Sequence, residues 1–149
     1  MNREDQIVEG FIKLYNKFEF LNSKKMKNSF NDLNSNEVHC IDYIGHNKDT
    51  NVTKLAEVFY QTRGGISKLV NKLIKKGYLS YYKKENNNKE IFYQLTNKGQ
   101  VIFNKHNKLH DEFRKRDEIV FDSLNEDDFN SIEKFINYYC NHLDNEINK

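Results

Sequence analysis

The apolar positions of this chain form a series of helical patterns, interrupted once by two short extended segments. Residues 3–21 predict a first helix, because apolar side chains recur there at alternating spacings of four and three, a narrow seam typical of helix–helix packing. The seam positions are Ile7, Phe11, Leu14, Phe18 and Leu21. The polar stretch at 22–32 predicts an irregular connection.

Two shorter helices are predicted next. Asn34 followed by Glu37 has the spacing of a capping box, so a helix is expected to begin at Asn34 or Ser35. Residues 45–49 predict a break, and Asn51 is a favourable N-cap for a third, short helix. The expected inward-facing positions are Val38, Ile41 and Ile44 in the first of these helices, and Leu55, Ala56 and Phe59 in the second.

Residues 62–77, TRGGISKLVNKLIKKG, predict an amphipathic helix that starts unusually, with two glycines in its first turn. Glycine costs about 1 kcal/mol against alanine inside a helix. Gly77 suits the left-handed position that follows a helix. The apolar positions with helical period are Ile66, Leu69, Val70, Leu73 and Ile74.

Residues 78–83 and 90–95 are rich in aromatic and branched side chains and predict two strands, joined by an asparagine-rich turn. Thr96 is expected to cap a long helix over 97–123, and Asn125 to start a last helix. The apolar positions of the last helix again alternate three and four: Phe129, Ile132, Ile136, Tyr139, Leu143 and Ile147.

This order of elements predicts a mainly α fold with a two-stranded β wing, a winged helix-turn-helix flanked by N- and C-terminal dimerisation helices. We expect a single chain with helix and loop at 1–33, a DNA-binding unit at 34–99, and dimerisation helices at 100–149. The apolar seams of the first and last helices are suited to packing against the same helices of a second copy of the chain, so we expect a homodimer. An intramolecular bundle of these helices is the alternative.

The net charge of +2 is unevenly distributed. Residues 51–99 hold ten Lys and Arg against three acids, a net of +7, whereas the remainder holds 14 against 19, a net of −5. A basic middle segment favours a polyanionic partner, although a solvated lysine face has the same composition.

Other features of the composition bear on location. The start, MNREDQ, leads us to expect no secretory signal, and no apolar run reaches the roughly 20 residues that span a bilayer. Cys40 and Cys140 lie far apart and form no CxxC pair. We therefore expect a reduced, cytoplasmic protein without a membrane partner.

Residues 51–99 resemble the DNA-binding core of MarR-family transcriptional regulators, through the LAE of the first paired helix, the KKGYL exit and a wing that closes on LTNKG. The resemblance implies an obligate dimer, a palindromic double-stranded DNA operator, and repression controlled by an effector. Two features depart from the family pattern. Tyr60 stands where the turn usually has Gly, and Asn87 and Lys89 stand where the wing usually has Asp and Arg.

The N-terminal turn of a recognition helix reaches base edges in the major groove, and an arginine fork matches the O6/N7 edge of guanine. Arg63 is therefore the best candidate for direct readout, and Lys72 for a phosphate contact. For Thr62 the alternative is a cap alone, and for Lys75 and Lys76 a favourable charge at the helix end. The candidate DNA-binding residues are Thr62, Arg63, Gly64, Gly65, Ser67, Lys68, Lys72, Lys83, Lys84, Asn87 and Lys89.

His106 and His110 lie four apart on the long helix, a spacing at which both imidazoles can hold one metal. The zinc-responsive regulators of the family place a His in the second helix and such a pair after the wing, so the resemblance implies a Zn²⁺ site at His39, His106 and His110. Glu19 is the nearest candidate for the acid that completes it. Ni²⁺, Co²⁺ and Cu²⁺ suit the same donors, and three surface histidines are the alternative.

Other functions are also open. Regulators of the family also bind small aromatic anions, for which the aromatic residues here provide a lining, and Cys40 is either an oxidant sensor or an inert buried thiol. A winged helix that binds protein is a further alternative. We expect no enzyme, because the chain has no glycine-rich phosphate loop after a strand, no GxSxG and no HExxH.

Overall fold

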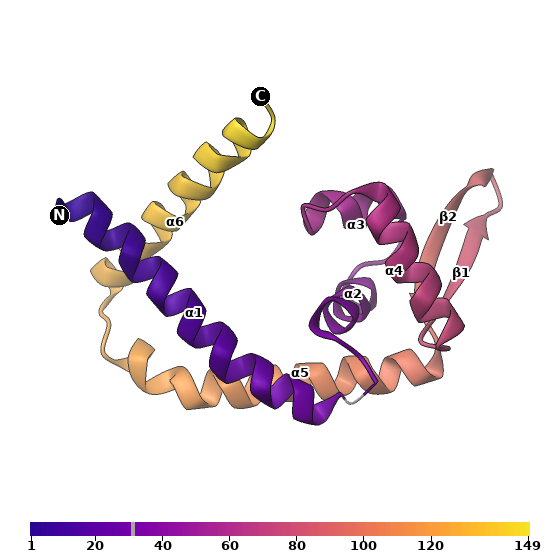
Figure 1. Cartoon of the computed structure of the whole chain (residues 1–149), viewed down its shortest axis with the longest axis horizontal. Helices are drawn as coiled ribbons and strands as arrows, with labels where there is room; N and C mark the ends of the chain where they lie inside the picture. Colours follow the sequence, from indigo (N-terminus) through magenta and orange to yellow (C-terminus); the bar gives the residue numbers. More distant parts are fainter. Residues whose placement is uncertain (31) are drawn as a thin grey trace. The chain divides into compact units, whose positions relative to one another are not determined.

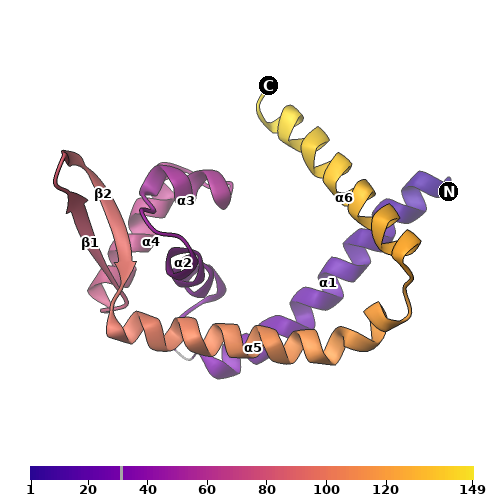
Figure 2. The same ribbon diagram turned by 180° about the vertical axis from the view of Figure 1, so that it is seen from behind.

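The computed structural model describes residues 1–30 and 32–149 (Figures 1 and 2). The described residues form helices and one antiparallel hairpin in the predicted order, which confirms a mainly α fold with a β wing. The elements are α1 (Arg3–Ser29), α2 (Ser35–His46), α3 (Val52–Val58), α4 (Arg63–Lys75), β1 (Leu79–Lys84), β2 (Asn87–Leu95), α5 (Asn97–Asp122) and α6 (Glu126–Ile147).

The chain divides into two compact units, Met1–Leu109 and His110–Lys149, with the boundary inside α5. The first unit contains α1 to β2 and the start of α5, and the second contains the rest of α5 together with α6. None of the helices within the described residues combines the length and the apolar character that crossing a bilayer requires.

Capping side chains determine where the helices begin. Asn34 and Glu37 form the predicted capping box: the Glu37 N–H donates to Asn34 Oδ1 at 2.9 Å, and the Asn34 N–H donates to Glu37 Oε1 at 3.1 Å. Asn125 and Asp128 repeat this reciprocal arrangement at the start of α6. Thr96 Oγ1 accepts the Gly99 N–H at 3.1 Å near the start of α5. The predicted helix starts are therefore confirmed.

Helix α1 is longer than predicted. The segment expected to be irregular continues the helix as far as Ser29, because it contains no Gly or Pro and because Met26 is buried, with 8% of its surface exposed. Phe30 ends the helix, and its N–H donates to Met26 O at 3.0 Å. Asn31, part of the same predicted connection, lies outside the described residues.

The prediction of a break at residues 45–49 was two residues early, since α2 runs on through Gly45 to His46. A side chain on Gly45 would collide with the ring of Phe103, so glycine permits the close approach of α2 to α5. Strand β2 begins at Asn87 rather than at 90, and Asn87 pairs with Lys84 across a two-residue turn.

The base of the wing is attached to the loop between α2 and α3. The Tyr93 N–H of β2 donates to Thr50 O at 2.9 Å, and the Tyr82 hydroxyl of β1 donates to Asp49 Oδ1 at 2.7 Å. The Lys84 ammonium lies 3.0 Å from Asp49 Oδ2. The hydrogen bond from Tyr82, followed by that from Lys84, lowers the pKa of the Asp49 carboxyl below its ordinary value. These contacts orient the wing relative to the helices.

The core of the first unit comes mainly from α2, α3, α4 and the hairpin. Its most deeply buried apolar side chains are Val38, Ile41, Leu55, Ile66, Val70, Leu73 and Leu79. Cys40 belongs to this core, with none of its surface exposed, and burial followed by the charge of Glu37 raises the pKa of its thiol to about 12. A thiol in this state is a poor nucleophile. This favours the interpretation of Cys40 as an inert buried thiol over that of an oxidant sensor.

A buried carboxylate joins the end of α4 to the start of α2. Glu37 is 1% exposed, and its Oε2 lies 3.1 Å from the Lys76 ammonium. The same ammonium donates to Asp32 O at 2.7 Å, and the Tyr78 hydroxyl donates to Asp32 Oδ2 at 3.3 Å. Lys76, for which a favourable charge at a helix end was the alternative interpretation, therefore forms contacts that belong to the fold.

We predict that Lys76→Ala lowers the free energy of unfolding by about 2–3 kcal/mol, because it leaves the Glu37 carboxylate buried without its cation. Lys75→Ala is the matched control, since Lys75 is exposed one residue earlier and should change stability by no more than about 0.5 kcal/mol. Urea unfolding followed by circular dichroism measures both values. Equal midpoints for the two variants would show that the pair does not stabilise the fold.

Candidate nucleic-acid interface

Helix α4 buries one face and exposes its N-terminal turn. Ile66, Val70 and Leu73 have none of their surface exposed, and they hold the helix against the core. The other candidate positions of the helix face outward. Those exposed are Thr62, Arg63, Gly64, Gly65, Lys68 and Lys72, and Ser67 is half-buried.

The first two turns of α4 carry positive charge that no described acidic side chain neutralises. Thr62 Oγ1 accepts the Gly65 N–H at 3.0 Å and so acts as the N-cap. Neither Arg63 nor Lys68 forms an ion pair with another described residue. Backbone N–H groups and the helix dipole add to this charge, and the turn has the chemistry of an anion-binding helix end.

The two glycines of this turn differ in their surroundings. A Cβ built on Gly65 would lie 3.1 Å from Thr62 Oγ1, so the cap itself favours glycine there. A Cβ on Gly64 would meet no atom of the described protein within 4 Å. No described residue explains the helix cost of Gly64, so we expect the reason to lie in something that approaches from outside.

The wing carries a second group of cations. Lys83 and Lys89 are exposed, whereas Lys84 pairs with Asp49 and lies 4.8 Å from the centre of the Phe92 ring. Asn87 shapes the turn, because its Oδ1 accepts the N–H groups of Lys89 and Glu90, both at 3.1 Å. Of these candidates, Lys83 and Lys89 are the ones available to an external anion.

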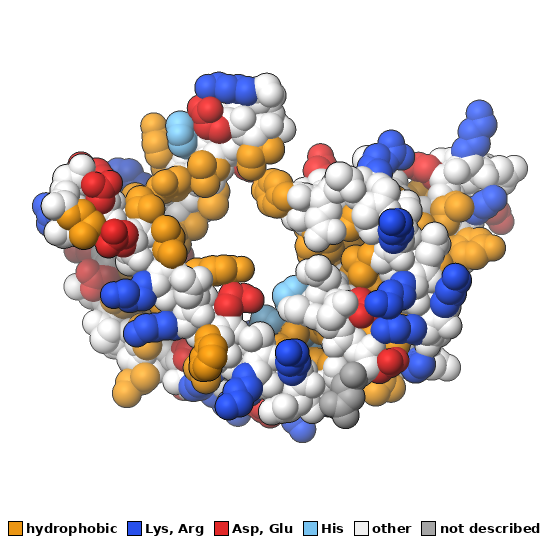
Figure 3. All heavy atoms as spheres, in the orientation of Figure 1, with side chains coloured by type: hydrophobic (Ala, Val, Ile, Leu, Met, Phe, Trp, Pro, Cys, Tyr) orange, Lys and Arg blue, Asp and Glu red, His pale blue; other side chains and the backbone are white. Residues whose placement is uncertain are grey.

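Lys and Arg side chains gather over the part of the molecule that carries α4 and the wing (Figure 3). This distribution matches the net charge of +7 in residues 51–99. A helix end without ion pairs to described residues, together with exposed lysines on the hairpin, gives the positive charge that a nucleic-acid surface requires.

Histidines from α2 and α5 meet around a carboxylate. The rings of His39 and His106 are edge-on, with their centroids 5.9 Å apart. His106 is 2% exposed, and its Nδ1 lies 3.1 Å from Asp42 Oδ1. His46 Nε2 approaches the same oxygen at 3.4 Å. Sequence reasoning missed Asp42 and His46, although their spacing of three and seven from His39 places all three close in angle around α2.

The remaining metal candidates are exposed. Glu19 lies on α1 in the first unit, and His110 lies on α5 at the start of the second unit, where its ring is 6.0 Å from that of Phe113. Across residues 1–30 and 32–149, no group of three or more His, Cys, Asp or Glu side chains is arranged to hold a metal ion.

Known proteins are similar to this chain in sequence and in fold. Residues 31–86 match the model of the MarR family. The HTH-type transcriptional regulator PchR of Bacillus subtilis (strain 168) is 31% identical over 117 residues, which cover 76% of this chain and 67% of PchR.

Two solved structures have the same fold over nearly the whole chain. FabT of Streptococcus pneumoniae, in complex with DNA, gives a TM-score of 0.81 at 22% identity and covers 95% of this chain and 98% of FabT. MarR of Staphylococcus aureus, in complex with salicylate and kanamycin, gives 0.76 at 14% identity and covers 96% of this chain and 93% of that one.

The chain belongs to the MarR family of winged-helix transcriptional regulators. Members of this family are DNA-binding proteins and not enzymes, as expected from the sequence. The helix α4 is thus the recognition helix of the fold, and the hairpin β1–β2 is its wing.

We predict that Gly64→Ala raises the free energy of unfolding by about 0.5–1 kcal/mol, because alanine is the better helix former and its methyl group meets only open space. The same variant should bind duplex DNA more weakly, because the methyl group stands between the helix end and DNA. Gly65→Ala is the comparison, and it should not gain stability, because its methyl group crowds the Thr62 cap.

Urea unfolding measures the change in the free energy of unfolding, and fluorescence anisotropy measures the change in affinity for duplex DNA. DNA binding unchanged by Gly64→Ala would exclude a close approach at this position.

Proposed function

We propose that this protein is a cytoplasmic homodimer that represses transcription by binding a palindromic operator with two copies of α4. The observation that carries the proposal is the N-terminal turn of α4, where Arg63 is exposed, forms no ion pair with a described residue, and lies beside Gly64. In a dimer, two such turns enter major grooves about one helical repeat apart, roughly 34–36 Å.

Exposed apolar side chains on α6 support the dimer. No residue of α6 is buried, although Ile132, Ile136, Tyr139 and Leu143 follow a regular helical seam and expose about two-fifths of their surface or more. An apolar stripe of this length is unfavourable in water and is typical of a surface that a second subunit covers.

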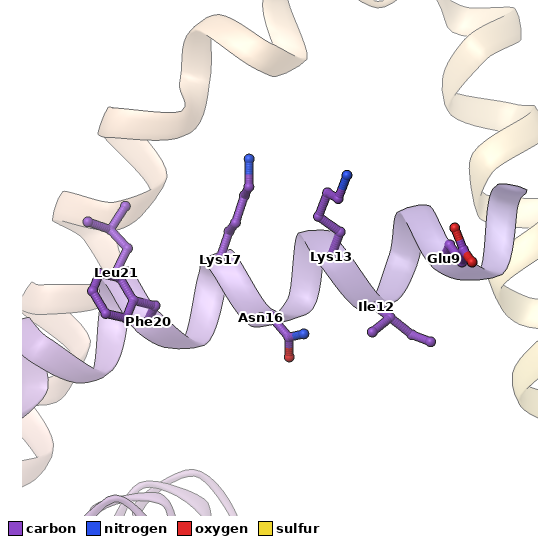
Figure 4. A pocket seen from close by; sticks show the side chains of 7 residues that line it. All are labelled: Glu9, Ile12, Lys13, Asn16, Lys17, Phe20 and Leu21. Carbon is purple, nitrogen blue, oxygen red and sulfur yellow. The ribbon is translucent and has the colours of Figure 1, made fainter.

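Helix α1 presents a similar surface. Phe11, Leu14 and Phe18 of its predicted seam are each more than 40% exposed. A hollow also runs along the helix, with Lys13 and Lys17 extending to one side and Ile12 to the other (Figure 4). The apolar surface of α1 thus extends beyond the narrow seam, as expected for a helix that contacts more than one element of a partner subunit.

Arg63→Ala should remove the preference for operator over random DNA, because it removes the guanine-reading fork. Lys89→Ala should weaken binding to both DNAs alike and reduce the salt dependence of binding by about one charge. Lys134→Ala, on the exposed surface of α6, is the control with unchanged binding. The operator is first selected from a random duplex pool by the unaltered protein, and affinity is measured by fluorescence anisotropy over a salt series.

Two outcomes would count against this proposal. Operator preference retained by Arg63→Ala would remove that residue from base readout. Failure of the unaltered protein to bind duplex DNA in a salt-dependent manner would favour the alternative, a winged helix that binds protein. Sedimentation of the complex should give two chains for each duplex.

We further propose a metal ion as effector, held by His39, His106 and His110, with Glu19 as the candidate acid. The edge-on approach of His39 to His106 and the nearby Asp42 support the His39–His106 part of this donor set. Metal-ligating histidines commonly present their second ring nitrogen to a carboxylate, the relation that His106 has with Asp42. When bound, Zn²⁺ would join α2 to α5 and favour one arrangement of the chain over others.

Calorimetric titration with Zn²⁺ tests the metal. The unaltered protein should bind Zn²⁺, and His106→Ala and His110→Ala should each bind it at least 10-fold more weakly, because each loses a ligand. His142→Ala, on the exposed surface of α6, is the control that keeps wild-type binding. Identical titrations for all four proteins would rule out this site and favour an organic effector, such as the salicylate bound by MarR of Staphylococcus aureus.

A further inference from the structure

The loop between α2 and α3 holds both strands of the wing. Asp49 holds β1: its Oδ1 accepts the Tyr82 hydroxyl at 2.7 Å, its N–H donates to the same hydroxyl oxygen at 3.1 Å, and its Oδ2 lies 3.0 Å from Lys84 Nζ. Asn51 holds β2, because its Nδ2 donates to Glu90 Oε1 at 3.0 Å. Attachment of both strands restricts rotation of the hairpin as well as its displacement.

These contacts reach the far end of the wing. Lys84 is the last residue of β1, and it pairs with Asn87, the first residue of β2, across the turn. The second carboxylate oxygen of Glu90 accepts Asn87 Nδ2 at 2.8 Å. Because an isolated two-stranded hairpin is only marginally stable in water, contacts that reach its tip determine where the tip lies.

The two available lysines of the wing lie beside the attached residues. Lys83 stands between the two β1 residues that contact Asp49, and Lys89 directly precedes Glu90. Both lysines are exposed. The direction in which each ammonium extends is therefore set by neighbours that are held by the loop.

The backbone and the charge at Asp49 both disfavour an aspartate. Its φ is 57°, in the left-handed region that glycine adopts most freely. An acid beside a DNA-binding surface also opposes the attraction of a polyanion. What an aspartate adds over glycine at this position is the carboxylate that holds β1.

We propose that Asp49 is a positioning residue for DNA binding: by holding β1, it directs Lys83 and Lys89 toward the phosphates that flank the groove entered by α4. The inference rests on the proposed DNA binding through α4 and the wing, and it assigns Lys84 to the attachment. It reverses the sign expected from charge alone. Removal of an acid from such a surface ordinarily strengthens DNA binding, whereas removal of Asp49 should weaken it.

Asp49→Gly is the direct test, because it removes the carboxylate and keeps a residue that adopts the same φ. It should weaken binding to the selected operator and to a random duplex by about 3- to 10-fold, the range for one or two lost hydrogen bonds. The salt dependence should fall at least as much as in Lys89→Ala. Fluorescence anisotropy over a salt series measures both quantities.

Two further variants separate attachment from charge. Tyr82→Phe removes the hydroxyl that binds Asp49 without any change of charge, and it should weaken binding in the same way. Glu85→Gln is the matched control, since Glu85 is an exposed acid in the turn of the wing. It makes the same change of charge as Asp49→Gly, and it should leave binding unchanged or strengthen it.

A coupling measurement separates positioning from a general effect on the fold. Lys89→Ala added to Asp49→Gly should change affinity less than half as much as Lys89→Ala alone, because the lysine has already lost its contact. The melting temperature of Asp49→Gly should stay within about 4 °C of that of the unaltered protein, because exposed ion pairs contribute at most about 1 kcal/mol.

Affinity for DNA that is unchanged or raised in Asp49→Gly, as in Glu85→Gln, would overturn the inference. Additive effects of Asp49→Gly and Lys89→Ala would also overturn it, whatever the melting temperature, because Asp49 would then not act through the wing. In both cases the unaltered protein still binds its operator, and the proposed function stands. Only failure of the unaltered protein to bind duplex DNA would overturn the proposed function and this inference together.

Discussion

The winged-helix part of this protein depends on one buried charge pair. A carboxylate that is 1% exposed is tolerated only if it is fully partnered, and Glu37 obtains its partners from the Asn34 N–H and the Lys76 ammonium. Glu37 stands in the first turn of α2, and Lys76 is the C-cap of the recognition helix. Their contact therefore sets where the two helices meet. Because Lys76 also binds Asp32 O, the segment that leads from α1 is attached at the same point.

The two ends of α4 consequently differ in how firmly they are attached to the rest of the protein. At the C-terminal end, the Thr96 hydroxyl donates to Gly77 O at 2.6 Å, and the Lys98 ammonium donates to Lys76 O at 2.7 Å. At the N-terminal end the Thr62 side chain caps the helix by accepting the Gly65 N–H at 3.0 Å, and the outward face is exposed. A firmly anchored C-terminal end allows the other end to keep Gly64, a poor helix former. The end of the helix that contributes least to the fold is the end that we propose binds DNA.

Local features of this structure could be predicted from the sequence, whereas long-range partners could not. The caps at Asn34, Thr62 and Asn125 act over three residues, so the helix starts followed directly from residue type and spacing. The partner of Lys76 lies 39 residues away, and no local pattern connects the two. The length of α1 was missed for the same reason, because the burial of Met26 depends on tertiary packing. The candidate DNA-binding turn was predicted because its signal, basic residues at a helix start, is local.

Helix α2 connects the histidines to the recognition helix. Its first turn carries Glu37, which holds the end of α4, and its later turns carry His39 and Asp42, which meet His106 of α5. A helix of 12 residues is short and rigid, so a force applied to one of its turns moves the others. A ligand that drew His39 and His106 together would therefore act on the same helix that positions α4. Allostery requires an element with two arrangements that both sites bias, and α2 contacts both the histidines and the end of α4.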